Sequence, residues 1–222
     1  RGPVLGGRLA ATMLEPSAIG DRSEGVRTPL FNALEGNQDI EVLTLAELEG
    51  IEGRPGNFSA SIRQKARWVT EDCTRCKNCH TVCPQVRPNE YDAGLTHRKA
   101  IYTPMSDTLP EPYLINIDDC LKTPPNYLPC NRCIEVCDDN AIHFDMPQET
   151  LHQLQVGAVI LAPGFQPFDP TLHSAYSYTK SPNVITAMEF ERILSASGPT
   201  FGHVVRPSDH KEPKKIAWIQ CV

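Results

Sequence analysis

The chain has 222 residues, of which 40% are hydrophobic and 22% charged, a composition that excludes a wholly disordered protein. A formal net charge of −6 argues against a general nucleic-acid binder, and the longest apolar run, residues 156–162, is too short to cross a membrane. No signal peptide opens the chain, so a cytoplasmic location is expected. Arg1 in place of Met is expected of a chain that is trimmed or that begins inside a longer protein.

Short strands are predicted on both sides of the cysteine-rich part of the chain. Residues 1–37 are rich in Gly, Pro and Arg and show little periodicity. Residues 38–45 favour a strand that enters a turn, apolar and polar residues alternate over 58–62, and a third strand is predicted over 67–70. A short closing strand is predicted over 142–145.

Eight of the nine cysteines form two motifs of similar spacing. The first motif, C-x2-C-x2-C-x3-C followed by proline, contains Cys73, Cys76, Cys79 and Cys83; the second, C-x9-C-x2-C-x3-C, contains Cys120, Cys130, Cys133 and Cys137. This is the spacing of bacterial [4Fe–4S] proteins, in which a short loop supplies three thiolates to one cluster and the fourth cysteine reaches the other cluster. The spacing therefore assigns Cys73, Cys76, Cys79 and Cys137 to cluster 1, and Cys120, Cys130, Cys133 and Cys83 to cluster 2.

Two other uses of these cysteines fit the spacing less well. Disulfide frameworks belong to short chains that cannot build a core, and this chain is long enough to build one. Structural zinc sites usually have two C-x2-C pairs separated by a spacer, not three cysteines at successive three-residue steps. A structural zinc protein is therefore kept only as a remote alternative.

The second motif departs from the first in two places. Its proline-rich nine-residue spacer predicts that Cys120 arrives on an extended loop, and Asp138 stands where a proline follows the first motif. Tolerated loop variation accounts for both departures. A sharper hypothesis is that Asp138 and Asp139 add negative charge near cluster 1 and lower its reduction potential.

An α/β pattern follows the cysteine motifs. Residues 156–162 form a continuous apolar run, as in a strand buried on both faces of a parallel sheet. Thr186 and Glu189 can form a capping box for a helix that runs to Ser197, and residues 215–221 start another buried strand. Strand, helix and strand imply an α/β layer beside or around the cysteine motifs.

Charge is unevenly distributed along the chain. Residues 54–103 carry nine Lys and Arg against four Asp and Glu, whereas residues 104–149 carry two against nine. The two halves either form complementary docking faces for two redox partners or attract each other within one solvated surface.

Several segments resemble the A subunit of heterodisulfide reductase and its relatives. They are residues 5–13, 52–69, 89–102, 157–165, 183–200 and 205–222. Members of that family are flavoproteins with a ferredoxin-like module inserted in the flavin domain, and they pass electrons between a flavin, several [4Fe–4S] clusters and partner subunits. The resemblance implies an α/β fold, namely a partial flavin-binding lobe of the pyridine-nucleotide-disulfide-oxidoreductase type, with an inserted α+β two-cluster ferredoxin-like module.

The same resemblance divides the chain and suggests a flavin site. It implies a partial flavin-domain segment over 1–50, the two-cluster module with flanking strands over 51–148, and an α/β return segment over 149–222. The residues that would lie near FAD are Gly6, Gly7, Arg8, Ala162 and Gly164.

Two features depart from the family pattern. The sequence contains no G-x-G-x-x-G, and the strand and phosphate loop expected before Gly6 are missing. Cys221 matches a family cysteine that helps to hold a further cluster together with downstream cysteines. Cys221 is therefore either a ligand of a further cluster or a buried apolar cysteine on a strand.

The sequence thus predicts an oxidoreductase subunit with no catalytic residue of its own. It is expected to be an electron-transfer iron–sulfur flavoprotein of an anaerobic heterodisulfide-reductase-like complex, relaying electrons between FAD and partner-subunit clusters through two [4Fe–4S] clusters. The expected partners are other subunits of such a complex and an electron-donating hydrogenase or dehydrogenase module, in a hetero-oligomer without nucleic acid or a membrane span. A flavin-free ferredoxin-like wire is the alternative, favoured by the missing phosphate loop.

Overall fold

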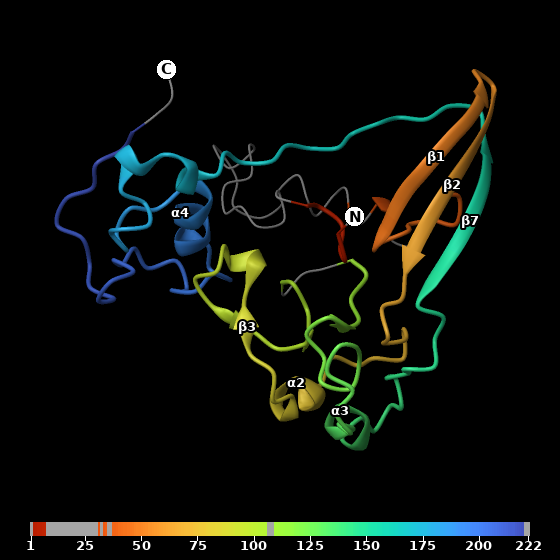
Figure 1. Cartoon of the computed structure of the whole chain (residues 1–222), viewed down its shortest axis with the longest axis horizontal. Coiled ribbons are helices and arrows are strands. Elements are labelled where there is room, and N and C mark those ends of the chain that lie inside the picture. The colour runs from red at the N-terminus through yellow and green to blue at the C-terminus, as the bar shows by residue number, and fades with distance from the viewer. Residues whose placement is uncertain (1, 8–30, 32, 35–36, 106–108, 220–222) are drawn as a thin grey trace.

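The computed structural model describes residues 2–7, 31, 33–34, 37–105 and 109–219. They form a small mixed α/β structure with three sheets of two or three strands. Figure 1 shows the three-stranded sheet at one end of the molecule, helix α4 at the opposite end, and the short helices α2 and α3 side by side between and below them.

The largest sheet is antiparallel and holds together the two ends of the cysteine-rich region. Its strands are β1 (Ala46–Arg54), β2 (Asn57–Lys65) and β7 (Glu149–Val156), in the order β1-β2-β7. Pro55 and Gly56 connect β1 to β2, and the φ of 87° at Gly56 is one that glycine adopts without strain. Because Lys65 pairs with Glu149, residues 66–148 leave and re-enter the sheet at neighbouring positions. We refer to residues 66–148 as the cysteine module.

The cysteine module contains only short elements. Strands β3 (Arg87–Pro88) and β4 (His97–Arg98) pair with each other, as do β5 (Ile101–Tyr102) and β6 (Leu114–Ile115). Helices α2 (Asn78–Val82) and α3 (Arg132–Glu135) each lie within a cysteine motif. A 3-10 turn at Glu90–Asp92 joins β3 to β4. A bridge between Val69 and Ile142 closes the module near its ends.

The main hydrophobic core lies inside this module, not under the large sheet. Its buried members are Trp68, Val69, Cys79, Ile101, Tyr113, Ile115, Ala141 and Ile142. Further cysteines of both motifs pack against them, namely Cys73, Cys83, Cys120, Cys133 and Cys137. The cysteines are therefore built into the core of the module, so the core fixes their relative positions.

The C-terminal part of the described chain has one regular helix, α4 (Ala187–Leu194), preceded by 3-10 turns at Pro170–Leu172 and Ser174–Tyr176. The predicted capping box is confirmed: the Glu189 N–H donates to Thr186 Oγ1 over 3.2 Å, and the Thr186 N–H donates to Glu189 Oε2 over 2.6 Å. The helix ends three residues earlier than predicted, because Ser195 already has extended backbone angles.

The strand predictions have mixed outcomes. The alternation over 58–62 is confirmed, since it lies within β2. The predicted strand over 38–45 is wrong, because β1 begins only at Ala46. The two short strands expected over 67–70 and 142–145 are reduced to the single bridge between Val69 and Ile142.

The apolar run at 156–162 does not form the predicted buried strand. Strand β7 ends at Val156, and residues 157–165 continue without secondary structure. Ile160 is 91% exposed and Leu161 72% exposed, because no described segment pairs with them. Residues 215–219 likewise form no strand, and Ile219 is 84% exposed. The parallel α/β layer expected from these runs is absent from the described residues, whose sheets are all antiparallel.

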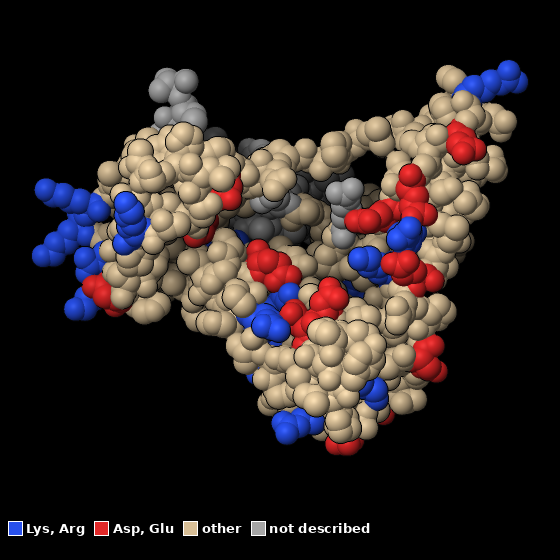
Figure 2. Space-filling model, viewed as in Figure 1, with Lys and Arg blue, Asp and Glu red and all other residues tan. Residues whose placement is uncertain are grey.

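The uneven charge of the two sequence halves is partly neutralised within the molecule. Ion pairs join Arg63 to Glu149 over 3.7 Å, Arg87 to Asp119 over 3.1 Å and Arg98 to Asp119 over 3.0 Å. Figure 2 shows acidic and basic side chains next to one another on the sheet and on the cysteine module. These pairs support the interpretation that the two halves attract each other, and not the one in which they form two separate docking faces. Within the described ranges, no helix is long and apolar enough to cross a membrane.

Candidate metal centres

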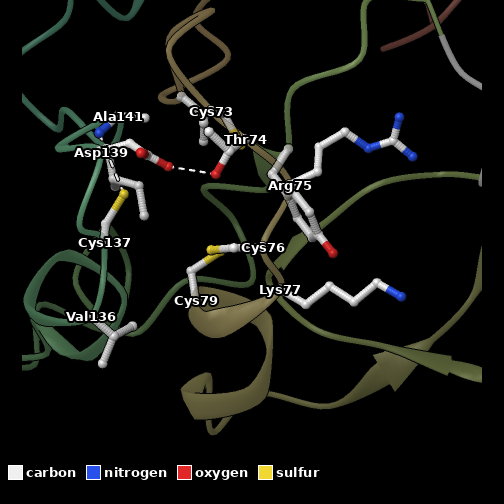
Figure 3. A pocket seen from close by; sticks show the side chains of 13 residues that line it. Cys73, Thr74, Arg75, Cys76, Lys77, Cys79, Val136, Cys137, Asp139 and Ala141 are labelled. Atoms are coloured by element: carbon white, nitrogen blue, oxygen red, sulfur yellow. Dashed lines mark hydrogen bonds between the residues drawn. The ribbon is translucent and has the colours of Figure 1, made fainter.

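Four cysteines line one hollow, which we call site 1. They are Cys73, Cys76, Cys79 and Cys137, and the hollow contains about 320 Å³ of space, open solvent included. In Figure 3, Cys76 and Cys137 point toward the space between them, whereas the side chains of Arg75 and Lys77 extend away from it. The first three cysteines come from one motif and the fourth from the other motif.

The backbone of the first motif turns its cysteines toward site 1. Arg75 and Lys77 both have left-handed backbone angles, with φ of 58° and 70°. A non-glycine residue in this region costs about 1 kcal/mol, and such residues concentrate at functional sites. Helix α2 begins directly after Lys77 and carries Cys79 into the core.

Two hydrogen bonds hold the second motif against site 1. Thr74 Oγ1 donates to Asp139 Oδ2 over 2.6 Å, so the loop that follows Cys73 is tied to the segment that follows Cys137. The Ala141 N–H donates to the Cys137 sulfur over 3.4 Å. Of the two aspartates singled out in the sequence, Asp139 therefore borders site 1; Asp138 is not among the residues that line it.

The other four cysteines of the motifs line a second hollow, site 2. They are Cys83, Cys120, Cys130 and Cys133, around about 360 Å³ of space, open solvent included. Cys83 caps the C-terminal end of α2 with extended backbone angles, so the chain leaves the helix at this residue. Helix α2 thus carries Cys79 to site 1 and ends at Cys83 in site 2.

The nine-residue spacer of the second motif folds back on itself and is not extended as predicted. The Leu128 N–H donates to the Leu121 carbonyl over 2.8 Å, which brings the two ends of the spacer together. Thr123 Oγ1 and Asn126 Nδ2 both donate to the Cys120 carbonyl, over 3.2 and 3.1 Å. Cys120 therefore reaches the same hollow as Cys130 despite their separation in sequence.

One thiol in each site, Cys79 in site 1 and Cys133 in site 2, has a raised pKa when no cation is present. Burial, with the charge of Cys73 added to it, raises the pKa of Cys79 to about 12. Burial and the charges of Cys120 and Cys130 raise the pKa of Cys133 to about 11. A bound cation reverses this effect, because it stabilises the thiolate form.

The residues present fit two [4Fe–4S] clusters by the chemistry of the donor set. Four thiols surround each hollow, none of the eight is in a disulfide, and four thiolates are the ligands that such clusters take. In the described part of the chain, no group of three His, Cys, Asp or Glu is arranged to hold a single metal ion. Trp68 lies in the core against which the cysteines pack. Its indole N–H is the one buried side-chain polar atom of the described residues that has no hydrogen-bond partner.

The residues predicted near a flavin lie outside both hollows. Gly6 and Gly7 follow Leu5, whose N–H donates to the Leu109 carbonyl over 2.9 Å, and both glycines have positive φ. Ala162 and Gly164 lie on the exposed segment after β7. Arg8 and Cys221 are outside the described residues.

Two arginines beside the sites, the half-buried Arg67 and the buried Arg98, were not singled out from the sequence. Arg67 donates to main-chain carbonyls of the segment 110–113, and Arg98 pairs with Glu90 and Asp119. Neither belongs to a recognisable motif, because their partners lie 8 to 64 residues away in the sequence.

Comparison with known proteins gives consistent matches along the chain. No family model matches it. The iron–sulfur A subunit of CoB–CoM heterodisulfide reductase from Methanocaldococcus jannaschii is 39% identical over 221 residues, which is 99% of this chain and 32% of that protein. One of two proteins of the same description in Methanopyrus kandleri is 42% identical with the same coverage. The A subunit of the H2:CoB–CoM heterodisulfide,ferredoxin reductase from Methanothermobacter thermautotrophicus is 39% identical over 84% of this chain and 27% of that protein.

The chain spans about a third of the length of the curated relatives that it matches. Those relatives are named as subunits of an oxidoreductase complex, and some names specify iron–sulfur. The resemblance found in the sequence is thus confirmed over nearly all of the chain. The chain belongs to the family of heterodisulfide reductase A subunits.

Proposed function

We propose that this chain is the two-cluster electron-relay region of a heterodisulfide-reductase-like complex. The observation that carries the proposal is the sorting of eight cysteines into two sets of four, each with one cysteine from the other motif. Crossed sets of this kind are the pattern of two-cluster ferredoxins. When bound, [4Fe–4S] clusters supply one-electron oxidation and reduction.

The protein's own part is to hold the two sites at a fixed separation. Helix α2 carries Cys79 and ends at Cys83, and α3 carries Cys133 and leads to Cys137, so each helix serves both sites. The core between them is tightly buried, with Ala141 0% and Ile101 2% exposed. Such a core shifts little, which favours a constant distance for electron transfer.

The flavin and the partners complete the proposal by resemblance. We place FAD near Gly6, Gly7, Arg8, Ala162 and Gly164, as the family resemblance implies. The proposed partners are other subunits of the complex and a hydrogenase or dehydrogenase module. The names of the relatives support this choice, since they mention hydrogen, formate and ferredoxin for those proteins.

Single cysteine substitutions test the assignment of ligands to sites. Cys137→Ser removes a site 1 ligand that lies in the second motif. We expect it to alter the electron paramagnetic resonance (EPR) signal of the same cluster as Cys76→Ser does, and to spare the cluster that Cys133→Ser alters. If Cys137→Ser instead acted on the same cluster as Cys133→Ser, each motif would hold its own cluster, and the crossed assignment would be wrong.

Flavin released by acid from the anaerobically purified complex tests the other half of the proposal. About one FAD per copy of the chain is the expected result. Absence of flavin, with both clusters retained, would support the flavin-free wire and would reject the placement of FAD near Gly6 and Gly164.

A further inference from the structure

Site 1 lies beside a half-buried arginine and site 2 beside a buried one, and at site 2 that arginine is neutralised. Arg98 is 8% exposed, and its guanidinium donates to both Glu90 carboxylate oxygens over 2.6 and 2.9 Å. It also donates to Asp119 over 3.0 Å, and Asp119 directly precedes Cys120, a residue of site 2. Arg87 contacts the same aspartate over 3.1 Å. Two guanidinium groups and two carboxylates therefore balance at this site.

The arginine beside site 1 is satisfied by neutral groups. The Arg67 guanidinium donates to the main-chain carbonyls of Pro3 over 2.8 Å and Tyr113 over 3.1 Å, and to those of Pro110 and Pro112. Among the residues that the structure describes, it forms no ion pair with Asp or Glu. Carbonyl oxygens satisfy its donors but carry no net charge, so no direct ion pair cancels the positive charge of Arg67, although the charge of Glu71 acts on it. Arginine remains protonated even when burial lowers its pKa, as burial does here.

The Arg67 guanidinium contacts a residue that lines site 1. Tyr113, whose carbonyl accepts the Arg67 hydrogen bond, lines site 1, and so does Val69, two residues along the chain. The charge of Cys73, a residue of site 1, also bears on the Arg67 guanidinium.

The charged residues that line the two hollows do not otherwise distinguish them. Site 1 is lined by Arg75, Lys77 and Asp139, and site 2 by Arg132, so each lining carries one net positive charge. Lys77, Asp139 and Arg132 are exposed and screened by solvent, and the half-buried Arg75 pairs with Glu111 over 3.7 Å. Arg67, which is half-buried and has no direct ion pair among the described residues, is therefore an electrostatic difference between the two sites.

We infer that Arg67 raises the reduction potential at site 1 above that at site 2, so that the electron of a half-reduced protein resides at site 1. Reduction adds a negative charge, and a fixed positive charge in a poorly solvated position stabilises the reduced form. The inference rests on the proposed function, because it requires a cluster at each site. Arg67 also donates a hydrogen bond to the carbonyl of Pro3, which lies in the same N-terminal loop as Gly6 and Gly7. The site that holds the electron is therefore the one connected to this loop through Arg67.

A redox titration followed by EPR tests the inference. Arg67→Met removes the charge and keeps an apolar stem, and we expect it to lower the potential of one cluster. The occupancy ratio of site 1 to site 2 in half-reduced protein should fall at least tenfold, which corresponds to about 59 mV for one electron. Cys76→Ser identifies which signal belongs to site 1. Arg63→Met, a substitution on β2 in a half-exposed ion pair, is the control and should leave both potentials unchanged.

A second substitution tests the same reasoning from the other site. Glu90→Gln removes one of the negative charges that neutralise Arg98, so it should raise the potential at site 2 and leave site 1 unchanged. Arg67→Lys keeps the positive charge and should retain most of the difference between the sites. If two clusters are present and neither Arg67→Met nor Glu90→Gln changes their reduction potentials, the inference is overturned and the proposed function stands. A protein that binds no pair of clusters would instead overturn the proposed function.

Discussion

Removal of the buried ion pair between α4 and the cysteine module should loosen the C-terminal part of the chain. Arg192 and Asp92 are 3% and 8% exposed, and two guanidinium nitrogens lie 2.9 and 2.8 Å from Asp92 Oδ1. The two residues are 100 positions apart in the sequence, so this pair fixes α4 to the 3-10 turn at Glu90–Asp92. In Arg192→Met the apolar stem is kept and the Asp92 carboxylate is left buried without its cation.

The free energy lost in Arg192→Met depends on the hydrogen bonds that Asp92 keeps. Breaking a buried pair by removal of one member costs about 3–5 kcal/mol. Asp92 keeps hydrogen bonds from Asn89 Nδ2 and Thr96 Oγ1, so the lower end of that range, about 3 kcal/mol, is expected. At about 1.36 kcal/mol for each factor of ten, this corresponds to a roughly hundredfold rise in the population in which α4 is detached.

Hydrogen exchange of the α4 amides measures this local opening directly. We expect the protection of residues 187–194 to fall roughly a hundredfold in Arg192→Met, with little change in β1 and β2. Arg206→Met removes an exposed pair with Asp209 and should change the free energy of opening by about 1 kcal/mol or less. Protection of α4 that is equal in the two variants would refute the view that the Arg192–Asp92 pair anchors this helix.

Two further predictions concern site 1 and the end of α4. Asp139→Asn removes a negative charge at site 1 and should raise the reduction potential there in a redox titration. The shift should be about 1 kcal/mol or less, roughly 40 mV for one electron, because Asp139 is exposed and solvent screens its charge. Asp138 does not line the hollow, so Asp138→Asn should shift this potential less. Gly198→Ala should destabilise the α4 region by at least about 1–3 kcal/mol in denaturant unfolding, since its new Cβ would overlap the Arg192 carbonyl oxygen. Gly50→Ala meets nothing within 4 Å and is the control, so an equal effect of both substitutions would contradict this reasoning.

Local sequence patterns predicted the local parts of this structure well. The capping box of Thr186 and Glu189 depends on residues three apart, and both of its hydrogen bonds are present. The cysteine spacing predicted two sets of four, and the structure places the same two sets around two hollows. Their role as cluster ligands stays a prediction.

Features that depend on distant residues could not be predicted in the same way. The apolar run at 156–162 has the composition of a buried strand, but burial requires neighbouring strands, and no described segment provides them. The Arg67 contact with Pro3 and the Arg192 contact with Asp92 join residues 64 and 100 positions apart, and no local pattern marks such pairs. The folded spacer before Cys130 depends on main-chain hydrogen bonds that composition does not specify.

The iron and acid-labile sulfide content of the anaerobically purified chain tests most directly whether the eight cysteines hold two [4Fe–4S] clusters. We predict about eight irons and about eight sulfides per chain, with a reduced-state EPR spectrum that shows magnetic interaction between two neighbouring clusters. Zinc without labile sulfide, or about four irons with the spectrum of one isolated cluster, would contradict the assignment of two clusters.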